Sequence, residues 1–412
     1  MAYVPPHKRH FKDADRPTPV PDSLVPQFRK NVNLRSPSTF QRGKDRSSFQ
    51  GPKIVYASSC ISRWWPVGST DNDPIPESFH LECIPCEPVE RERGEKPLVL
   101  VDRKLPTEAN KVMESSESSP WLFIAEKVQP DLLATLQNVK IELESQGEEF
   151  KPSFVARFGK IFFHGGSSMS LDIIRNAAIA EANSRNKLNK SFYTHVPSVY
   201  LEEIEDLIVP RIGFDFNSEK EQYHVKIFDK SQPDVTISCK CTITEDHGKL
   251  EMYKAELNQV RHLVEDISCL YKDLDLRLML WNKRILMDLD DAEKVAIGKL
   301  IEAAVVAPDA KGGLRWPLGK ESAGDRFSVI GVWHTKYRAF KNPSMKLKLR
   351  HADRFDFRSS KGEVSNEATL KMTTISRWLR DGVVDTGRVI KMFQEAVKLI
   401  WDNFLDCNHK LA

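Results

Sequence analysis

Residues 345–358 alternate polar and apolar side chains, with the same parity before and after residues 351–353. The polar positions are mostly basic, and the apolar positions between them are largely filled by Met345, Leu347, Leu349, Phe355 and Phe357. Because successive side chains of a β-strand point to opposite faces, this pattern predicts a long strand with one wet, basic face and one buried face. A strand of that kind belongs to an antiparallel sheet that has one polar side.

The overall charge of the chain says little about its ligands. Among 412 residues, 61 Lys and Arg nearly balance 58 Asp and Glu, so the net charge is +3. This balance removes any argument from whole-protein charge for nucleic acid or for an anionic membrane. The basic residues are concentrated at the N-terminus, where residues 1–50 hold ten Lys and Arg against four Asp.

Composition divides the chain into three parts. Residues 1–50 are rich in Pro, Ser and basic residues and lack hydrophobic periodicity, so we predict a disordered arm. Residues 51–119 contain short strand-like segments between Pro-rich and acidic loops, and we predict that they are partly mobile. Residues 120–412 carry the regular patterns of an α+β domain.

The sequence also bears on the cellular compartment. No apolar run approaches the roughly 18 residues that a membrane helix needs, and the N-terminus lacks the apolar core of a secretory signal. We therefore expect a cytoplasmic or nuclear protein that makes no membrane contact. Seven cysteines in such a chain predict free thiols rather than a disulfide framework.

Further periodic segments extend the fold prediction. Alternation predicts strands at residues 223–227, 235–243, 274–280 and 328–340, and helical spacing predicts helices at 132–143, beginning at Pro130, and at 385–405. Strands 345–358 and 363–372 are expected to form a hairpin with Arg358 opposite Glu363 and Arg354 opposite Glu367, because opposite charges favour that register. The predicted fold is α+β, a large and mainly antiparallel sheet with helices on its apolar face. The strand count permits closure toward a barrel without requiring it.

Two glycine-containing segments are candidate anion sites. Strand 154–163 runs into His164, Gly165, Gly166 and Ser167, where free backbone N–H groups before a helix could hold a phosphate. A tight turn followed by a serine cap explains the same residues.

The second segment, residues 311–320, is Gly-rich and ends in Gly319 and Lys320 like a phosphate-binding loop. Leu314 replaces the first required glycine and Glu321 replaces the magnesium-binding hydroxyl, so a nucleoside triphosphatase loop is disfavoured. Arg315, Trp316 and Lys320 could still grip an anion or stack a base, or Trp316 could simply pin an ordered connection.

One cluster has the spacing of metal ligands. His80, Cys83 and Cys86 could make three contacts to zinc, but structural zinc sites usually have four ligands. We therefore predict free thiols, no metal site and no cofactor.

Basic residues on the predicted strands form the largest candidate binding surface. They are Lys226, Lys240, Arg277, Lys346, Lys348 and Arg350. Three interpretations remain open: an RNA-binding sheet face beside aromatic residues, an ordinary solvated face balanced by acidic residues, or the lining of a closed barrel that forms a polar tunnel for phosphate chains.

The opening residues MAYVPPHKRH resemble the start of a family of uncharacterised plant proteins that carry a domain of unknown function. Segments 256–262, 312–320 and 352–357 resemble the same family, which implies no known activity. Separately, residues 3–9 are similar to a Tyr-Ile-Pro-Pro-His-x-Arg element in the N-terminal tails of DEAD-box RNA helicases. In those helicases the element contacts translation-initiation partners, so the resemblance implies that Tyr3, Pro5, Pro6 and Arg9 contact a protein partner.

Two functional hypotheses follow. The leading one is a non-enzymatic binding or adaptor protein associated with RNA or ribonucleoprotein, whose arm contacts a protein partner. The alternative is an enzyme that acts on a phosphorylated or nucleotide substrate within a polar cleft of the sheet. We find neither a clear nucleophile elbow nor clearly paired catalytic carboxylates, so no catalytic residue is assigned.

Overall fold

The computed structural model describes most of the chain beyond the N-terminal arm. The described residues are 55–69, 75–103, 119–145, 150–179, 188–232, 235–244, 249–257, 259–286, 289–317, 322–382 and 385–409. The predicted arm with Tyr3, Pro5, Pro6 and Arg9 lies outside these residues, and so does Lys320.

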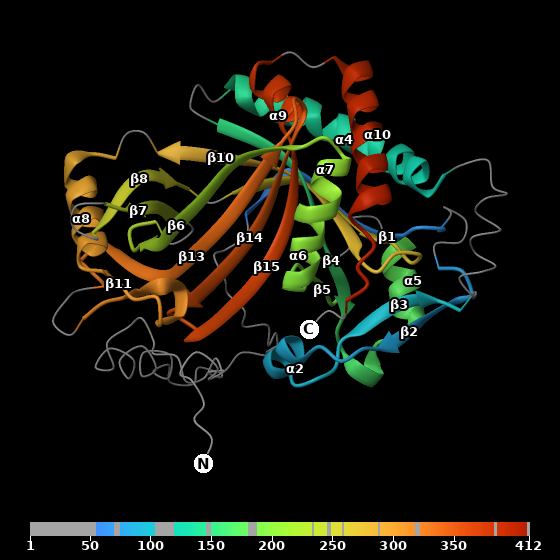
Figure 1. Ribbon diagram of the computed structural model, residues 1–412, viewed down its shortest axis with the longest axis horizontal. Helices are drawn as coiled ribbons and strands as arrows, with labels where there is room; N and C mark the ends of the chain where they lie inside the picture. The colour runs from blue at the N-terminus through green and yellow to red at the C-terminus, as the bar shows by residue number, and fades with distance from the viewer. Residues whose placement is uncertain are drawn as a thin grey trace, which may run out of the picture.

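Eight antiparallel strands form a closed ring of backbone pairings, which we call the strand ring (Figure 1). Neighbouring strands pair in the order β10, β8, β7, β6, β13, β14, β15 and β4, and β4 pairs again with β10. Their bounds are β4 Phe150–Phe163, β6 Asp215–Asp229, β7 Thr236–Ile243, β8 Leu250–Glu256, β10 Asp275–Leu286, β13 Phe327–Lys341, β14 Met345–Asp356 and β15 Lys361–Met372.

Shorter strands extend the sheet beyond the ring. β9 (Val260–Ser268) lies antiparallel to β10, and β1 (Val55–Pro66) lies parallel to β9. At the far end of β4, β3 (Leu98–Asp102) and β5 (Lys190–Tyr193) pair with it, and β2 (Phe79–Cys83) pairs with β3. The helix α2 (Glu87–Arg93) connects β2 with β3.

Three helices cover one side of the ring from outside (Figure 1). They are α4 (Pro120–Ser145), α9 (Thr373–Arg380) and α10 (Thr386–Asn403). The largest hydrophobic core lies between them and the apolar faces of β4, β10, β14 and β15, where Phe158 stacks on Phe404 at 5.1 Å and Phe154 packs on Phe393. This packing uses the apolar parity of each strand and turns the polar parity away from the helices.

A second core covers the outer side of β6, β7 and β8. The helix α8 (Asp291–Glu302) begins with a capping box between Asp290 and Glu293 and packs its buried Ile297 into this core. The short elements β11 (Val305–Val306), η5 (Lys311–Gly313) and β12 (Leu314–Arg315) follow it. The polar sides of these strands therefore also face the inside of the ring.

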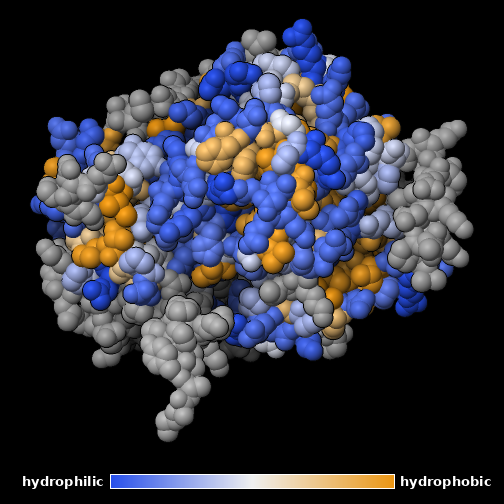
Figure 2. All heavy atoms as spheres, viewed as in Figure 1, coloured by the Kyte–Doolittle hydropathy of each residue, from blue (hydrophilic) through white to orange (hydrophobic). Residues whose placement is uncertain are grey.

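Further helical elements are η3 (Gly166–Ser168), α5 (Leu171–Ile179), α6 (Ser198–Glu203), η4 (Ile204–Ile208) and α7 (Val209–Arg211). The outer surface on the face shown in Figure 2 is mainly hydrophilic, and hydrophobic side chains gather only in small separate areas there. Among the described helices, none combines the length and the apolar composition that crossing a bilayer demands.

The predicted fold class is confirmed: a large, mainly antiparallel sheet carries helices on its apolar side. The predicted hairpin is present, but its register is wrong by four residues, since Arg354 lies opposite Glu363 and Arg350 opposite Glu367. The reason is that Phe357 leaves the hairpin: its N–H donates to the carbonyl of Ile330, and its ring packs on Trp316. A shift by an even number of residues keeps every side chain on the predicted face.

The predicted start of the first long helix is also wrong. The helix α4 begins at Pro120 and continues through Pro130 instead of starting there. Trp121, Ile124 and Val128 on the added turns pack in the main core, and this burial outweighs the hydrogen bond that Pro130 cannot donate.

Candidate anion-binding site

The inside of the strand ring is lined mainly by polar side chains, and most of the charged ones are basic. Alternate positions on each strand point inward because the remaining positions belong to the two outer cores. Ten of the inward basic residues are accompanied by three carboxylates, Glu256, Glu363 and Glu367, so the cations of this set outnumber the anions. These basic residues are Arg157, Lys226, Lys240, Lys254, Lys283, Lys346, Lys348, Arg350, Arg354 and Lys371. We call this set the basic interior.

Charges of the basic interior influence one another across the ring. Burial, together with the charges of Arg350, Lys240 and Lys283, lowers the pKa of Lys348 on β14 to about 7. Burial and neighbouring lysines likewise lower the pKa values of Lys226 and Lys240 to about 8, against an ordinary value of 10.5. In the ring order β14 lies three strands from β7 and three strands from β10, so Lys240 and Lys283 act on Lys348 across the interior and not between neighbouring strands.

One carboxylate is shared by three lysines. Glu256 lies 3.0 Å from Lys240, 2.6 Å from Lys254 and 3.0 Å from Lys283, measured between carboxylate oxygens and Nζ atoms. Burial alone would raise the pKa of Glu256, but the three lysines outweigh burial and hold the pKa well below its usual range. One negative charge cannot neutralise three positive charges, so this cluster keeps a net positive charge whenever its lysines are protonated.

Glu367 has a similar role between arginines. It pairs with Arg350 at 3.3 Å and with Arg354, and Arg157 lies near enough to stabilise its charge. Although burial opposes ionisation, these arginines lower the pKa of Glu367 to about 2. The carboxylate is therefore ionised at every physiological pH, yet it is outnumbered by guanidinium groups.

Four inward lysines, Lys226, Lys346, Lys348 and Lys371, form no ion pair with a carboxylate within the described part of the chain, and two of them lie against aromatic rings. The Nζ of Lys226 lies 4.4 Å from the centre of the Trp333 ring, and the Nζ of Lys348 lies 4.2 Å from that of Tyr337. Cation–π contact stabilises an ammonium group less than an ion pair would in so confined a place. A bound anion would therefore supply Lys226 and Lys348 with the counter-charge that they lack in the protein.

Like charges also lie directly opposite one another on neighbouring strands. The opposed pairs are Lys240 with Lys254, Arg157 with Arg277, and Lys151 with Lys283. Directly opposed like charges destabilise a sheet, by roughly 0.2–1 kcal/mol per pair. The interior remains accessible to solvent, since the exposed side-chain fractions are 19% for Lys240, 24% for Lys283 and 27% for Arg350.

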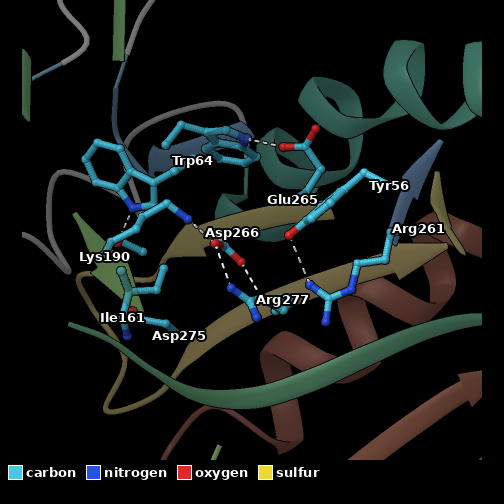
Figure 3. A network of polar contacts seen from close by, with 11 residues as sticks. Tyr56, Trp64, Ile161, Lys190, Arg261, Glu265, Asp266, Asp275 and Arg277 are labelled. Atoms are coloured by element: carbon cyan, nitrogen blue, oxygen red, sulfur yellow. Dashed lines mark hydrogen bonds and ion pairs between the residues drawn. The ribbon is translucent and has the colours of Figure 1, made fainter. Parts of the chain in front are cut away.

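A network of polar contacts surrounds Asp266 of β9 (Figure 3). The carboxylate of Asp266 on β9 accepts hydrogen bonds from Arg277 at 2.5 and 2.9 Å and pairs with Lys190 of β5. On neighbouring residues, the indole of Trp65 donates to Glu265 at 3.0 Å and that of Trp64 donates to Ser268 at 3.0 Å. These bonds fasten β1 and β9 onto β10, and they neutralise Arg277.

The structure brings together five of the six strand residues that the sequence singled out. Lys226, Lys240, Lys346, Lys348 and Arg350 all belong to the basic interior. Arg277 lies on the same face, but Asp266 already neutralises it. Sequence reasoning missed five site residues, which are Arg157, Lys254, Lys283, Arg354 and Lys371. Arg157, Lys254 and Lys371 lie between apolar neighbours as the predicted residues do, whereas Lys283 lies between Asn282 and Arg284.

The predicted anion site at residues 164–167 is occupied by a side chain of the protein itself. The N–H of Gly165 donates to a carboxylate oxygen of Glu95 at 2.9 Å, and buried His164 hydrogen-bonds to Ser191 at 2.7 Å. Gly166 begins η3, which also includes Ser167, and the helix α5 starts only at Leu171. This loop follows the end of β4 and takes no part in the basic interior.

The other predicted segment has a packing role in the structure. Trp316 is completely buried, donates its indole N–H to the carbonyl of Leu300 at 3.0 Å, and packs on Phe357. Its ring is therefore not available to stack a base. Arg315 is exposed on β12, outside the strand ring.

The described residues hold no group of three or more His, Cys, Asp or Glu side chains that could bind a metal ion. All seven cysteines are present as free thiols. Cys239 and Cys241 lie in the outer core of β7, as their spacing in the strand predicts.

Comparison with solved structures gives the following distant matches. The RNA triphosphatase Pct1 of S. pombe matches with a TM-score of 0.41 and 10% identity, over 68% of this chain and 93% of that chain. The PH1012 protein of Pyrococcus horikoshii matches at 0.24 and 10%, over 50% and 87%. A putative adenylate cyclase of Bacillus halodurans matches at 0.23 and 12%, over 53% and 92%. Scores this low bear on neither the activity nor the ligand of this chain.

No curated protein matches the sequence. A family model, by contrast, matches residues 48–404, which include every residue of the basic interior. The model describes a domain of unknown function, DUF7903. Because the match covers most of the chain, the protein belongs to the DUF7903 family.

Proposed function

We propose that this protein binds the phosphate chain of a phosphorylated or nucleotide ligand inside the strand ring. The observation that carries the proposal is the excess of cations over carboxylates on the inner face, with like charges placed directly opposite one another. A closed ring cannot relieve this repulsion by moving the side chains apart. A bound polyanion would relieve it, and charged groups act strongly in such a confined site.

The arrangement of the cations favours an elongated ligand over a single anion. Basic residues on β14 extend from Lys346 to Arg354, which is about 26 Å along the strand at roughly 3.3 Å per residue. Basic side chains of the other ring strands point into the same interior at several positions along its length. Because these residues face inward, an RNA strand lying across an open sheet surface could not reach them, whereas a phosphate chain entering by its end could.

Calorimetric titration of the full chain with inorganic tripolyphosphate tests the proposal. We expect saturable binding whose affinity falls steeply as the salt concentration rises. The double variant Lys226→Gln/Lys348→Gln should bind at least about tenfold more weakly, because two charge-assisted contacts are lost. Because neither lysine forms an ion pair with a carboxylate, we expect the double variant to remain folded.

Lys336→Gln is the matched control, because Lys336 lies on the outer face of β13 with a 59% exposed side chain. This variant should bind tripolyphosphate as the wild type does. Absence of binding at low salt, or equal weakening by both variants, would rule out the ring interior as the site.

Catalysis on the bound chain is a second candidate, and it corresponds to the enzyme hypothesis from the sequence. It is supported by Lys348, whose pKa of about 7 suits proton transfer near neutral pH, and by His224, whose pKa burial lowers well below its ordinary value. Release of inorganic phosphate from tripolyphosphate, with and without added divalent cations, checks it. No release under conditions of saturating binding would leave a binding protein.

The adaptor hypothesis adds a protein partner at the N-terminal arm, where Tyr3, Pro5, Pro6 and Arg9 form the proposed contact. Its support is the similarity to the helicase tail element, together with the cytoplasmic or nuclear location expected from the sequence. A labelled peptide of residues 1–12 and its Tyr3→Ala variant would test direct binding to translation-initiation proteins. Equal binding of the two peptides would remove this motif from consideration.

A further inference from the structure

Two cavities lie at one end of the strand ring, beside α9. One has a volume of about 270 Å³ and is lined in part by Lys151, Lys371, Arg377 and Arg380. The other has about 450 Å³ and includes Lys341 and Lys346 in its lining. Both share Pro343 and Thr373, so they flank the same edge of the ring. We call these six basic residues the basic mouth.

Three lysines of the mouth stand side by side in the sheet. Lys346 on β14 lies directly opposite Lys341 on β13 and directly opposite Lys371 on β15. Such a row of like charges on three adjacent strands is unfavourable without an anion nearby. Of the residues that line the two cavities, Asp215 is the one carboxylate.

Lys371 links the mouth electrostatically to the basic interior. Burial lowers its pKa, and the charges of Lys346, Arg380, Lys254 and Lys151 lower it further. Lys254 belongs to the Glu256 cluster inside the ring, whereas Arg380 and Lys151 line the outer cavity. The positive charge is therefore continuous from the interior, through Lys371, to the surface.

We infer that the mouth is a second anion subsite and that the ligand is a linear polyanion, inorganic polyphosphate, which extends from the interior out through the mouth. This inference rests on the proposed function, since it needs a phosphate chain inside the ring. The inferred ligand is a longer chain than tripolyphosphate, because basic residues continue beyond the end of the ring interior.

The chemistry of the two sites favours polyphosphate over RNA. The 270 Å³ cavity has no aromatic residue in its lining, so it offers no surface for base stacking. Inside the ring, Trp333 is already covered by Lys226 and Arg354, and Tyr337 by Lys348. An eight-stranded ring is just wide enough inside for its side chains, which admits a thin phosphate chain more readily than nucleotides.

The experiment compares tripolyphosphate with long-chain inorganic polyphosphate on the full chain and on Arg377→Gln/Arg380→Gln. Both arginines are exposed on α9, so their removal should leave the ring intact. We expect the variant to bind long-chain polyphosphate about fivefold or more weakly and to bind tripolyphosphate within about twofold of the wild type. Arg388→Gln/Lys391→Gln on α10 removes the same charge away from the mouth and should change neither affinity.

The outcomes separate the two proposals. Failure of tripolyphosphate to bind the wild type would overturn the proposed function. Binding of tripolyphosphate that depends on Lys226 and Lys348, with long chains unaffected by the α9 variant, would overturn the mouth subsite alone. A single-stranded oligonucleotide that binds as tightly as polyphosphate and loses affinity in the α9 variant would overturn the assignment to polyphosphate.

Discussion

Glu256 illustrates how a single carboxylate stabilises a ring interior in which basic side chains repel one another. Its carboxylate is 5% exposed and contacts three lysines from three different strands. In the sheet it lies opposite Ser238 of β7 and Ile285 of β10, at the position where the ring closes. One acidic side chain thus neutralises part of the charge and stands at the closure of the ring.

Replacing this carboxylate should be costly. We expect Glu256→Gln to lower the free energy of unfolding at pH 7 by about 3 kcal/mol, because lysines that are confined together lose their shared counter-charge. Chemical denaturation measures the change. Glu251→Gln, at an exposed position of the same strand, is the control and should cost less than about 0.5 kcal/mol. Equal stability of the two variants would show that the Glu256 cluster contributes nothing to folding.

At the scale of elements, the strand ring has its weakest seam between β8 and β10. β10 pairs with β4 at ten positions, from Asp275 to Arg284, but it pairs with β8 only at Ile285 and Leu286. Most of the edge of β10 is used by β9 instead. The ring therefore closes through two residue pairs, and local opening there disrupts the fewest hydrogen bonds.

Hydrogen exchange should reveal this seam. Among the ring strands, we expect the amides of β8 and of residues 284–286 to exchange fastest, and tripolyphosphate to slow them because the ligand bridges cations on both sides of the seam. Mass spectrometry after pepsin digestion measures the exchange. The amides of β14, which pairs along its whole length with β13 and β15, serve as the protected reference. Ligand protection confined to the outer helices would contradict a ligand inside the ring.

At the scale of the whole molecule, the net charge of +3 conceals a strong separation of charge between interior and surface. Lys348, with its pKa of about 7, carries a penalty in the folded state whenever it is protonated. The unfolded chain binds this proton up to about pH 10.5, the ordinary lysine value. Between pH 7 and 10.5 the unfolded state therefore holds more protons, and the contribution of Lys348 to stability rises with pH.

We expect Lys348→Gln to be more stable than the wild type at pH 7, and this advantage to shrink by up to about 1 kcal/mol per pH unit toward pH 9. Thermal and chemical denaturation at several pH values measure it, and Lys336→Gln should show no such trend. The difference in stability between variant and wild type excludes the contributions of other titrating groups. One such group is Glu265, whose pKa is raised by burial to about 8. Tripolyphosphate affinity should fall over the same pH range, because the lysines lose their charge. A pH-independent difference would mean that Lys348 is not confined as described.

Much of the fold could be predicted from local pattern. The alternation in β7 and β14 and the apolar stripe of α10 identified these elements and the correct face of each, because side-chain periodicity depends on the backbone alone. The hairpin register could not be predicted, since Arg354 meets an acidic residue in either register: Glu363 opposite it in the structure, Glu367 in the prediction. The position of Phe357 in the outer core decided between them.

The candidate site was predicted only in part. Lys226, Lys240, Lys346, Lys348 and Arg350 stood out as basic positions on predicted strands. Nothing in the sequence places Lys283 beside Glu256, because they come from strands whose pairing depends on closure of the ring. The two glycine-containing segments were predicted as anion sites from their motifs alone. In the structure, the N–H of Gly165 donates to Glu95, and Trp316 packs in the second core.

By itself, the sequence determined that the strands are amphipathic and that their polar faces are basic, since a period of two residues is a local property of the chain. Only the tertiary structure decided where those faces point. The same basic strand in an open sheet would face water, where its charges are screened and separate freely. Closure through β4 and β10 turns them toward one another, and the resulting long-range contacts make the interior a site for a polyanion.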